Sequence, residues 1–153
     1  KIKRTLKQYK FQKFIDLGCG SGRVIDYFDK NFSEKKFVGI EYFSNQYEDC
    51  IKSFNERINI KIIREDFTNF NFIMHNADCY FFNNPFKKDS NIIQMIDKIL
   101  KYQSIKENIL FIFVNFDKKI IDKLDNVKCI QNYYINNNKG FSIYLLNQKK
   151  TDE

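Results

Sequence analysis

The chain has 153 residues, of which 43% are hydrophobic and 17% aromatic, enough to bury the core of one domain. No apolar run approaches the roughly 18 residues of a membrane-spanning helix, which argues against a membrane partner. The formal net charge of +7 is concentrated at the start of the chain, because residues 1–13 contain no acid but hold Lys1, Lys3, Arg4, Lys7, Lys10 and Lys13. Such a basic arm can contact nucleic acid or another anionic surface, although a solvated lysine-rich stretch is the simpler interpretation.

The cysteines are far apart in the sequence and include no C-x-x-C pair. With His75 as the single histidine, the spacing of Cys19, Cys50, Cys79 and Cys129 predicts neither a metal site nor a disulfide framework. We therefore expect reduced thiols and a cytoplasmic protein.

Apolar runs alternate with polar or glycine-rich turns through the first half of the chain. Ser44 follows such a run and predicts the N-cap of a helix that ends near Glu56. In chain order, the pattern predicts a helix end in the basic arm through Ile2, Leu6 and Tyr9, a strand at 14–17, a helix through Val24, Ile25 and Phe28, a strand at 36–41, the helix from Ser44, and strands at 58–63 and 78–82.

The second half begins with a helix that Ser90 opens and that carries isoleucines on one face. Residues 109–114 are continuously apolar, which predicts a strand covered on both sides. A short helix over residues 118–124 precedes two β-rich runs, 127–135 and 140–146. The asparagine- and glycine-rich turn between these runs predicts an antiparallel hairpin.

Five strand–helix units followed by a hairpin predict an α/β fold with a doubly wound, mostly parallel sheet of seven strands and one reversed strand. We expect one domain over residues 14–148, preceded by the basic arm 1–13 and followed by a short tail at 149–153.

The most informative segment joins the first strand to the first helix and reads Asp16-Leu17-Gly18-Cys19-Gly20-Ser21-Gly22. Glycines let the backbone turn sharply and approach a ligand closely, and the following helix offers free N–H groups. In a doubly wound sheet, this loop lies at the carboxyl ends of the strands, where ligands bind. Arg23 stands where a dinucleotide-binding fingerprint needs its third glycine, which disfavours a nicotinamide cofactor.

This segment resembles motif I of the class I, Rossmann-like S-adenosylmethionine-dependent methyltransferases, and the resemblance extends from Phe14 to Leu146. It implies that S-adenosyl-L-methionine is the cofactor. The residues of motif I that it places at the cofactor are Asp16, Gly18, Cys19, Gly20 and Gly22.

Further cofactor contacts fall at the ends of the second and third strands. Glu41 ends the second strand, where a carboxylate can accept hydrogen bonds from both ribose hydroxyls, and Tyr42 follows it. The resemblance implies that Asp66 accepts a hydrogen bond from the adenine amino group. It also implies that Phe67 contacts adenine through its N–H or its ring.

The fourth strand ends in Asn83-Asn84-Pro85-Phe86, which resembles motif IV of the amino methyltransferases, an Asp or Asn followed by two prolines and an aromatic residue. An amide oxygen there can accept hydrogens from an amine and aim its lone pair at the methyl group, and an aromatic ring can stack on a planar acceptor. Asn84 replaces the first proline, so Asn84-Pro85-Phe86 is an alternative register of the motif. We place Asn83 beside the cofactor in either register.

The sequence therefore predicts a methyltransferase that acts on a nitrogen of a protein, a nucleic acid or a small molecule. Three alternatives stay open: an O-methyltransferase of a small molecule or sugar, a nicotinamide-dependent oxidoreductase, and a non-catalytic module that binds the cofactor or RNA. Tyr133 and Tyr134 either line a substrate face or pack within the protein. The acceptor and the oligomeric state are not predicted.

Overall fold

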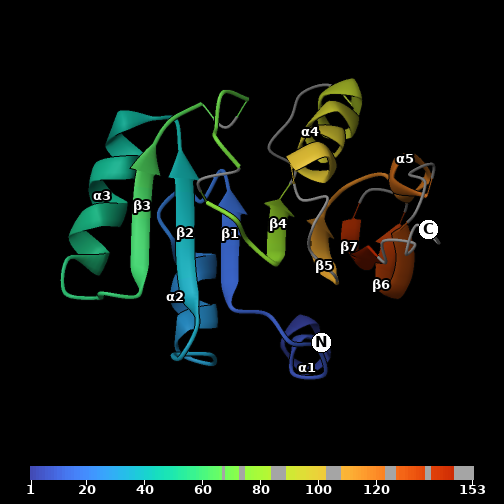
Figure 1. Cartoon of the computed structure of the whole chain (residues 1–153), viewed down its shortest axis with the longest axis horizontal. Helices are drawn as coiled ribbons and strands as arrows, with labels where there is room; N and C mark the ends of the chain where they lie inside the picture. The colour runs from blue at the N-terminus through green and yellow to red at the C-terminus, as the bar shows by residue number, and fades with distance from the viewer. Residues whose placement is uncertain are drawn as a thin grey trace, which may run out of the picture.

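The computed structural model describes residues 1–66, 68–72, 75–83, 89–102, 108–122, 127–136 and 139–146. Seven strands form one sheet in the order β3-β2-β1-β4-β5-β7-β6, which Figure 1 shows from left to right. β7 is antiparallel to both neighbours and the other neighbouring strands are parallel, so the predicted doubly wound sheet with one reversed strand is confirmed. The strands are β1 (Lys13–Leu17), β2 (Lys36–Glu41), β3 (Ile60–Arg64), β4 (Cys79–Asn83), β5 (Ile109–Val114), β6 (Val127–Asn136) and β7 (Lys139–Leu146).

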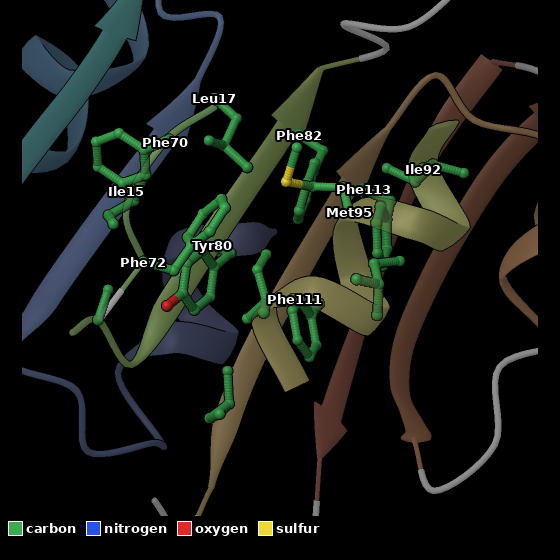
Figure 2. Close-up of a cluster of buried hydrophobic side chains, with 14 of the residues drawn as sticks. Ile15, Leu17, Phe70, Phe72, Tyr80, Phe82, Ile92, Met95, Phe111 and Phe113 are labelled. Atoms are coloured by element: carbon green, nitrogen blue, oxygen red, sulfur yellow. The ribbon is translucent and has the colours of Figure 1, made fainter. Parts of the chain in front are cut away.

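Helices cover both faces of the sheet. They are α1 (Ile2–Leu6), α2 (Arg23–Asp29), α3 (Ser44–Phe54), α4 (Asp89–Tyr102) and α5 (Lys118–Ile121). Buried side chains of α1, α2 and α3 share one apolar cluster with Phe14, Phe81 and Ile143 of the sheet. Buried side chains of α4 belong to a second cluster on the opposite face, part of which Figure 2 shows. No helix within the described ranges is long and apolar enough to span a membrane.

The connection from β3 to β4 contains no helix among its described residues, which corrects the expectation of five strand–helix units. Aromatic side chains cover the sheet there instead. Phe70 and Phe72 are at most 1% exposed, their ring centroids are 5.0 Å apart, and His75 stacks on Phe70. Figure 2 shows both phenylalanines beside Ile15 and Tyr80. These rings bury the apolar surface that a helix would otherwise cover.

Three predicted boundaries differ from the structure near the second and third strands. Ser44 is the first residue of α3 and not its cap; the cap position belongs to Phe43, which has an extended backbone and no capping side chain. α3 ends at Phe54, before the predicted end. β3 begins at Ile60, because the Ile58 side chain is fully exposed and cannot belong to a buried alternation.

The ends of three other helices refine the prediction. α1 ends at Leu6, so Tyr9 lies outside the helix. α4 begins at Asp89, one residue before its predicted start. α5 spans Lys118–Ile121, and residues 123–126, where its end was predicted, lie outside the described part of the chain.

The register of the central strands brings three segments of the chain to one edge of the sheet. Leu17 of β1 pairs with Ile40 of β2 on one side and with Phe82 of β4 on the other. The residues that follow these three therefore lie together at the carboxyl ends of the strands: Gly18, Glu41 and Asn83.

Candidate functional site at the carboxyl edge of the sheet

The loop between β1 and α2 is bonded to the end of β2. The N–H groups of Gly18 and Cys19 both donate to the Ile40 carbonyl oxygen, at 2.9 and 3.0 Å. Gly18, Gly20 and Gly22 have φ values of 81°, 55° and 80°, in the region that favours glycine. The loop therefore turns sharply into α2, as the glycine pattern predicts.

Two of these glycines differ in their surroundings. A Cβ atom at Gly22 would lie 2.4 Å from the Phe54 ring and 2.8 Å from Cys50 Sγ, so the loop packs against α3 there. A Cβ atom at Gly20 would meet only Gln46 Oε1, at 3.4 Å. The Gly20 backbone thus faces open space, which leaves room for a ligand.

Glu41, at the end of β2, holds this loop in place through hydrogen bonds. Its side chain is only 4% exposed. Its Oε2 accepts a hydrogen bond from the Gly20 N–H at 2.8 Å, and its Oε1 accepts one from the Phe43 N–H at 2.9 Å. A carboxylate offers about four acceptor positions, so two remain for a ligand such as a ribose. The sequence predicted a ligand-binding role for Glu41 but not its hydrogen bonds to Gly20 and Phe43.

Asp16 lies in β1, directly before the loop, and is 2% exposed. Its Oδ2 is buried and has no hydrogen-bond partner among the described residues. Burial, and then the charge of Glu41, raise the pKa of Asp16 from 3.8 to about 7. Two neighbouring buried carboxylates, one with an unbonded oxygen, favour a ligand that carries a positive charge, because a cation compensates both of them.

The Cys19 thiol takes no part in this charge pattern. Its contact with the Cys50 thiol, together with burial, raises the pKa of Cys19, so the thiol stays protonated. In the described ranges, no group of three or more His, Cys, Asp and Glu side chains could hold a metal ion.

A pocket of about 330 Å³ opens beside Glu41, at the ends of β2 and β3; small-molecule sites are usually about 300–1,000 Å³. Its lining residues are Tyr42, Phe43, Ser44, Arg64, Glu65 and Asp66. Tyr42 is 59% exposed and offers a ring face. Asp66 Oδ1 accepts hydrogen bonds from the N–H and the hydroxyl of Thr68, at 2.9 and 2.7 Å, which leaves Oδ2 for a ligand. Phe67 lies outside the described residues.

Asn83 is exposed at the tip of β4, and a second amide meets it from β5. Asn115 Nδ2 donates to Asn83 Oδ1 at 3.4 Å. Asn115 has a φ of 59°, and its N–H donates to the Gly140 carbonyl oxygen at 2.8 Å. Residues 84–86, the rest of the predicted motif IV, lie outside the described part of the chain.

Five residues of this edge were not predicted as site residues: Phe43, Ser44, Arg64, Glu65 and Asn115. Arg64 and Glu65 line the pocket beside Asp66, but a charged residue after a strand is too common to indicate a site. Asn115 could have been found, because it ends a predicted strand in the same way as Asn83.

Comparisons with known proteins agree with this geometry. The family model described as "Methyltransferase domain" matches residues 14–103. No curated protein sequence matches the chain. The fold is similar to the methyltransferase domain of bacterial CtHen1 (15% identity, TM-score 0.68), with 96% of this chain and 95% of that chain covered. An RNA methyltransferase from Salinibacter ruber in complex with S-adenosyl-L-homocysteine has 13% identity and a TM-score of 0.68, with 99% of this chain and 94% of that chain covered.

A methyltransferase from Aquifex aeolicus described as dependent on S-adenosylmethionine has the same fold, at 11% identity and a TM-score of 0.70, with 94% of this chain and 88% of that chain covered. The family match covers more than half of this chain and decides against an oxidoreductase that uses a nicotinamide. The chain belongs to the methyltransferase domain family, and its cofactor is S-adenosylmethionine.

Proposed function

We propose that this enzyme transfers the methyl group to a nitrogen acceptor held beside Asn83. The observation that carries the proposal is the place of Asn83, one residue beyond the Leu17–Phe82 pair and therefore next to Gly18. An exposed carboxamide at this position lies where the methyl group would be presented. An amide oxygen suits an amine, whose N–H groups it accepts.

The cofactor would extend along the tips of β1, β2 and β3. Glu41 would accept hydrogen bonds from the ribose hydroxyls, and Asp66 would accept one from the adenine amino group, with Tyr42 and Phe67 against adenine. The backbone of the loop from Gly18 to Gly22 would contact the methionine part. Asp16 fits the positive charge of that part, because its Oδ2 is buried without a partner among the described residues.

S-adenosylmethionine supplies a methyl group on a sulfonium centre. In the transfer, the carbon–sulfur bond would break as a carbon–nitrogen bond forms, and the methylated amine would then give up a proton to water. The chain therefore contributes positioning. Asn83 Oδ1 accepts an N–H of the acceptor and so points the lone pair at the methyl group. Asn115 donates to the same oxygen and holds the carboxamide in place, while Phe86 would stack on a planar acceptor.

The acceptor can be identified with a methyl donor that carries a radioactive methyl group. Separate pools of RNA, DNA, protein and small molecules are incubated with the enzyme, and the labelled product is identified by mass spectrometry. We expect the label on an amino nitrogen. Excess S-adenosylhomocysteine should abolish it. A product methylated only on oxygen would contradict the nitrogen acceptor and favour the O-methyltransferase alternative.

Replacing Glu41 with alanine is expected to weaken S-adenosylhomocysteine binding about ten- to a hundredfold, the scale of about 1.5–3 kcal/mol for hydrogen bonds to a charged group. The change removes the ribose acceptor and the bond that holds the Gly20 N–H. Calorimetry measures the affinity. Glu34→Ala is the control, because Glu34 is exposed near the start of β2, at the opposite edge of the sheet. Wild-type affinity in a folded Glu41→Ala protein would remove Glu41 from the cofactor site.

A further inference from the structure

A groove of about 500 Å³ lies between α1 and the edge strand β6, away from the cofactor pocket. Figure 1 shows α1 at the end of the sheet where β1 begins. The two walls of the groove are fixed to each other, because the Thr5 hydroxyl of α1 hydrogen-bonds to Gln131 Oε1 of β6 and Leu6 is fully buried. These contacts hold the basic arm against the sheet.

The lining of this groove is basic, aromatic and rich in amides, and it contains no carboxylate. Lys1 and Arg4 supply the charge, and Gln8, Gln131 and Asn132 supply amide donors and acceptors. The salt bridges found within the described ranges lie elsewhere and involve neither Lys1 nor Arg4. The charges of these two residues are therefore available to an anionic partner.

Tyr133 gives the groove an aromatic surface. Its side chain is 45% exposed, Lys1 Nζ lies 3.4 Å from its ring centroid, and the Phe141 ring is 6.2 Å away. Lys1 Nζ lies over one face of this ring, and its flexible side chain can turn to a phosphate while a base takes its place on the ring, so the pair suits a nucleotide. The neighbouring Tyr134 differs, since its hydroxyl is hydrogen-bonded to Ser142 at 3.1 Å.

The sheet register connects this groove to the acceptor position. Tyr133 pairs with Phe141 of β7, and Phe141 pairs with Val114 of β5. Val114 in turn pairs with Asn83. Three strand spacings of about 4.8 Å place Tyr133 and Asn83 roughly 14 Å apart, a few nucleotides of an extended strand.

These four side chains also share one face of the sheet. Val114 and Phe141 pack on the cluster that contains Phe81. Side chains two residues apart on a strand point to the same face, so the Asn83 side chain lies on the same face as Phe81. Val114 and Phe141 are partly exposed, whereas Asn83 and Tyr133 are exposed. An accessible apolar row thus runs from the groove to the tip of β4.

We propose that the groove between α1 and β6 binds a single-stranded nucleic acid and guides one of its bases along this row to Asn83. The proposal rests on the proposed nitrogen acceptor, to which it adds a substrate class. A single strand fits because only unpaired bases can stack on Tyr133 and reach a side chain at a strand tip. The amides of the groove favour a nucleic acid over a membrane surface, since they can bond to base edges.

Binding can be measured without the cofactor, by fluorescence anisotropy of labelled 15-nucleotide single-stranded RNA and DNA of mixed sequence on the full chain. Tyr133→Ala is expected to weaken binding about tenfold through the loss of one stacked base. Tyr27→Ala is the matched control, because Tyr27 is 50% exposed on α2, and it should bind like the wild type.

The charged side of the groove has its own measurement. Affinity should fall with salt, with a log–log slope of about −0.7 for each phosphate neutralised, and Arg4→Gln should make that slope shallower by about 0.7. Lys52→Gln, an exposed change on α3, should leave the slope unchanged.

Three results would overturn the proposal: no binding at low salt, an unchanged affinity in folded Tyr133→Ala, or equal binding to vesicles of phosphatidylserine and phosphatidylcholine. Strong binding that depends on Tyr133, without methylation of the bound strand, would contradict the delivery of a base to Asn83 and with it a nitrogen acceptor on nucleic acid, although the groove would still bind the strand.

Discussion

Asn83→Ala is expected to lower turnover about 10²-fold or more, the scale of losing a group that positions the acceptor. The affinity for S-adenosylhomocysteine should barely change, because the main cofactor contacts that we propose lie on β1, β2 and β3. Steady-state kinetics with the identified acceptor, combined with calorimetry, measures both quantities. The Asn83 side chain is exposed, so we expect the variant to fold and to give the circular dichroism spectrum of the native protein.

Asn84→Ala is the matched variant, because the sequence allows two registers of motif IV. If Asn83 is the first residue of the motif, Asn84→Ala should retain most of the turnover. A selective loss of turnover in Asn84→Ala would shift the motif by one residue. If both alanine variants methylate at the wild-type rate, the mechanism in which an amide positions an amine is wrong.

Asp16→Asn is expected to make the cofactor-free protein more stable above pH 7 and to weaken S-adenosylhomocysteine binding at least tenfold. The folded-state pKa of about 7 lies above the ordinary value of 3.8, so the folded protein holds a proton that the unfolded chain releases. Between these two values the free energy of unfolding falls as pH rises, by on the order of 4 kcal/mol at 1.36 kcal/mol per pKa unit. Asparagine does not ionise, so the variant should not lose this stability as pH rises. It also carries no negative charge to neutralise a ligand cation.

Urea unfolding at pH 4 and pH 8 measures the effect, which should be small at the lower pH and large at the higher one. Asp29→Asn is a matched control, because Asp29 is also buried but its oxygens accept hydrogen bonds from Arg57 and Asn59, at 2.7 and 2.6 Å. That variant should lose stability at pH 8. If the Asp16→Asn protein is no more stable than the wild type at pH 8, the claim that the Asp16 carboxylate destabilises the cofactor-free protein is wrong.

The succession of strands along the chain could be anticipated because the apolar runs are bounded by turn signals. The run at 109–114, for example, is uniformly apolar, and it forms β5, which is buried on both faces. The connection between β3 and β4 could not be anticipated in the same way. Phe70 and Phe72 have no helical or strand periodicity around them, and only the assembled sheet shows what they cover.

Parts of the candidate site could be predicted where the local backbone accepts only one type of residue. Gly22 is such a position, since its φ of 80° and its contact with Phe54 leave no room for a side chain. The hydrogen bonds from Gly20 and Phe43 to Glu41 were not predictable, because they depend on how the loop folds back over β2. The same holds for the meeting of Asn83 and Asn115, which needs β4 and β5 to be neighbours.

The place of β7 in the sheet has a consequence for how the chain acquires its structure during synthesis. β7 lies between β5 and β6, and β6 has no other strand neighbour in the described sheet. When residues 127–136 leave the ribosome, their backbone N–H and C=O groups therefore have no strand to pair with until residues 139–146 follow. The charged residue Lys128 on β6 is of the kind that protects exposed strand edges from pairing with other chains during such an interval.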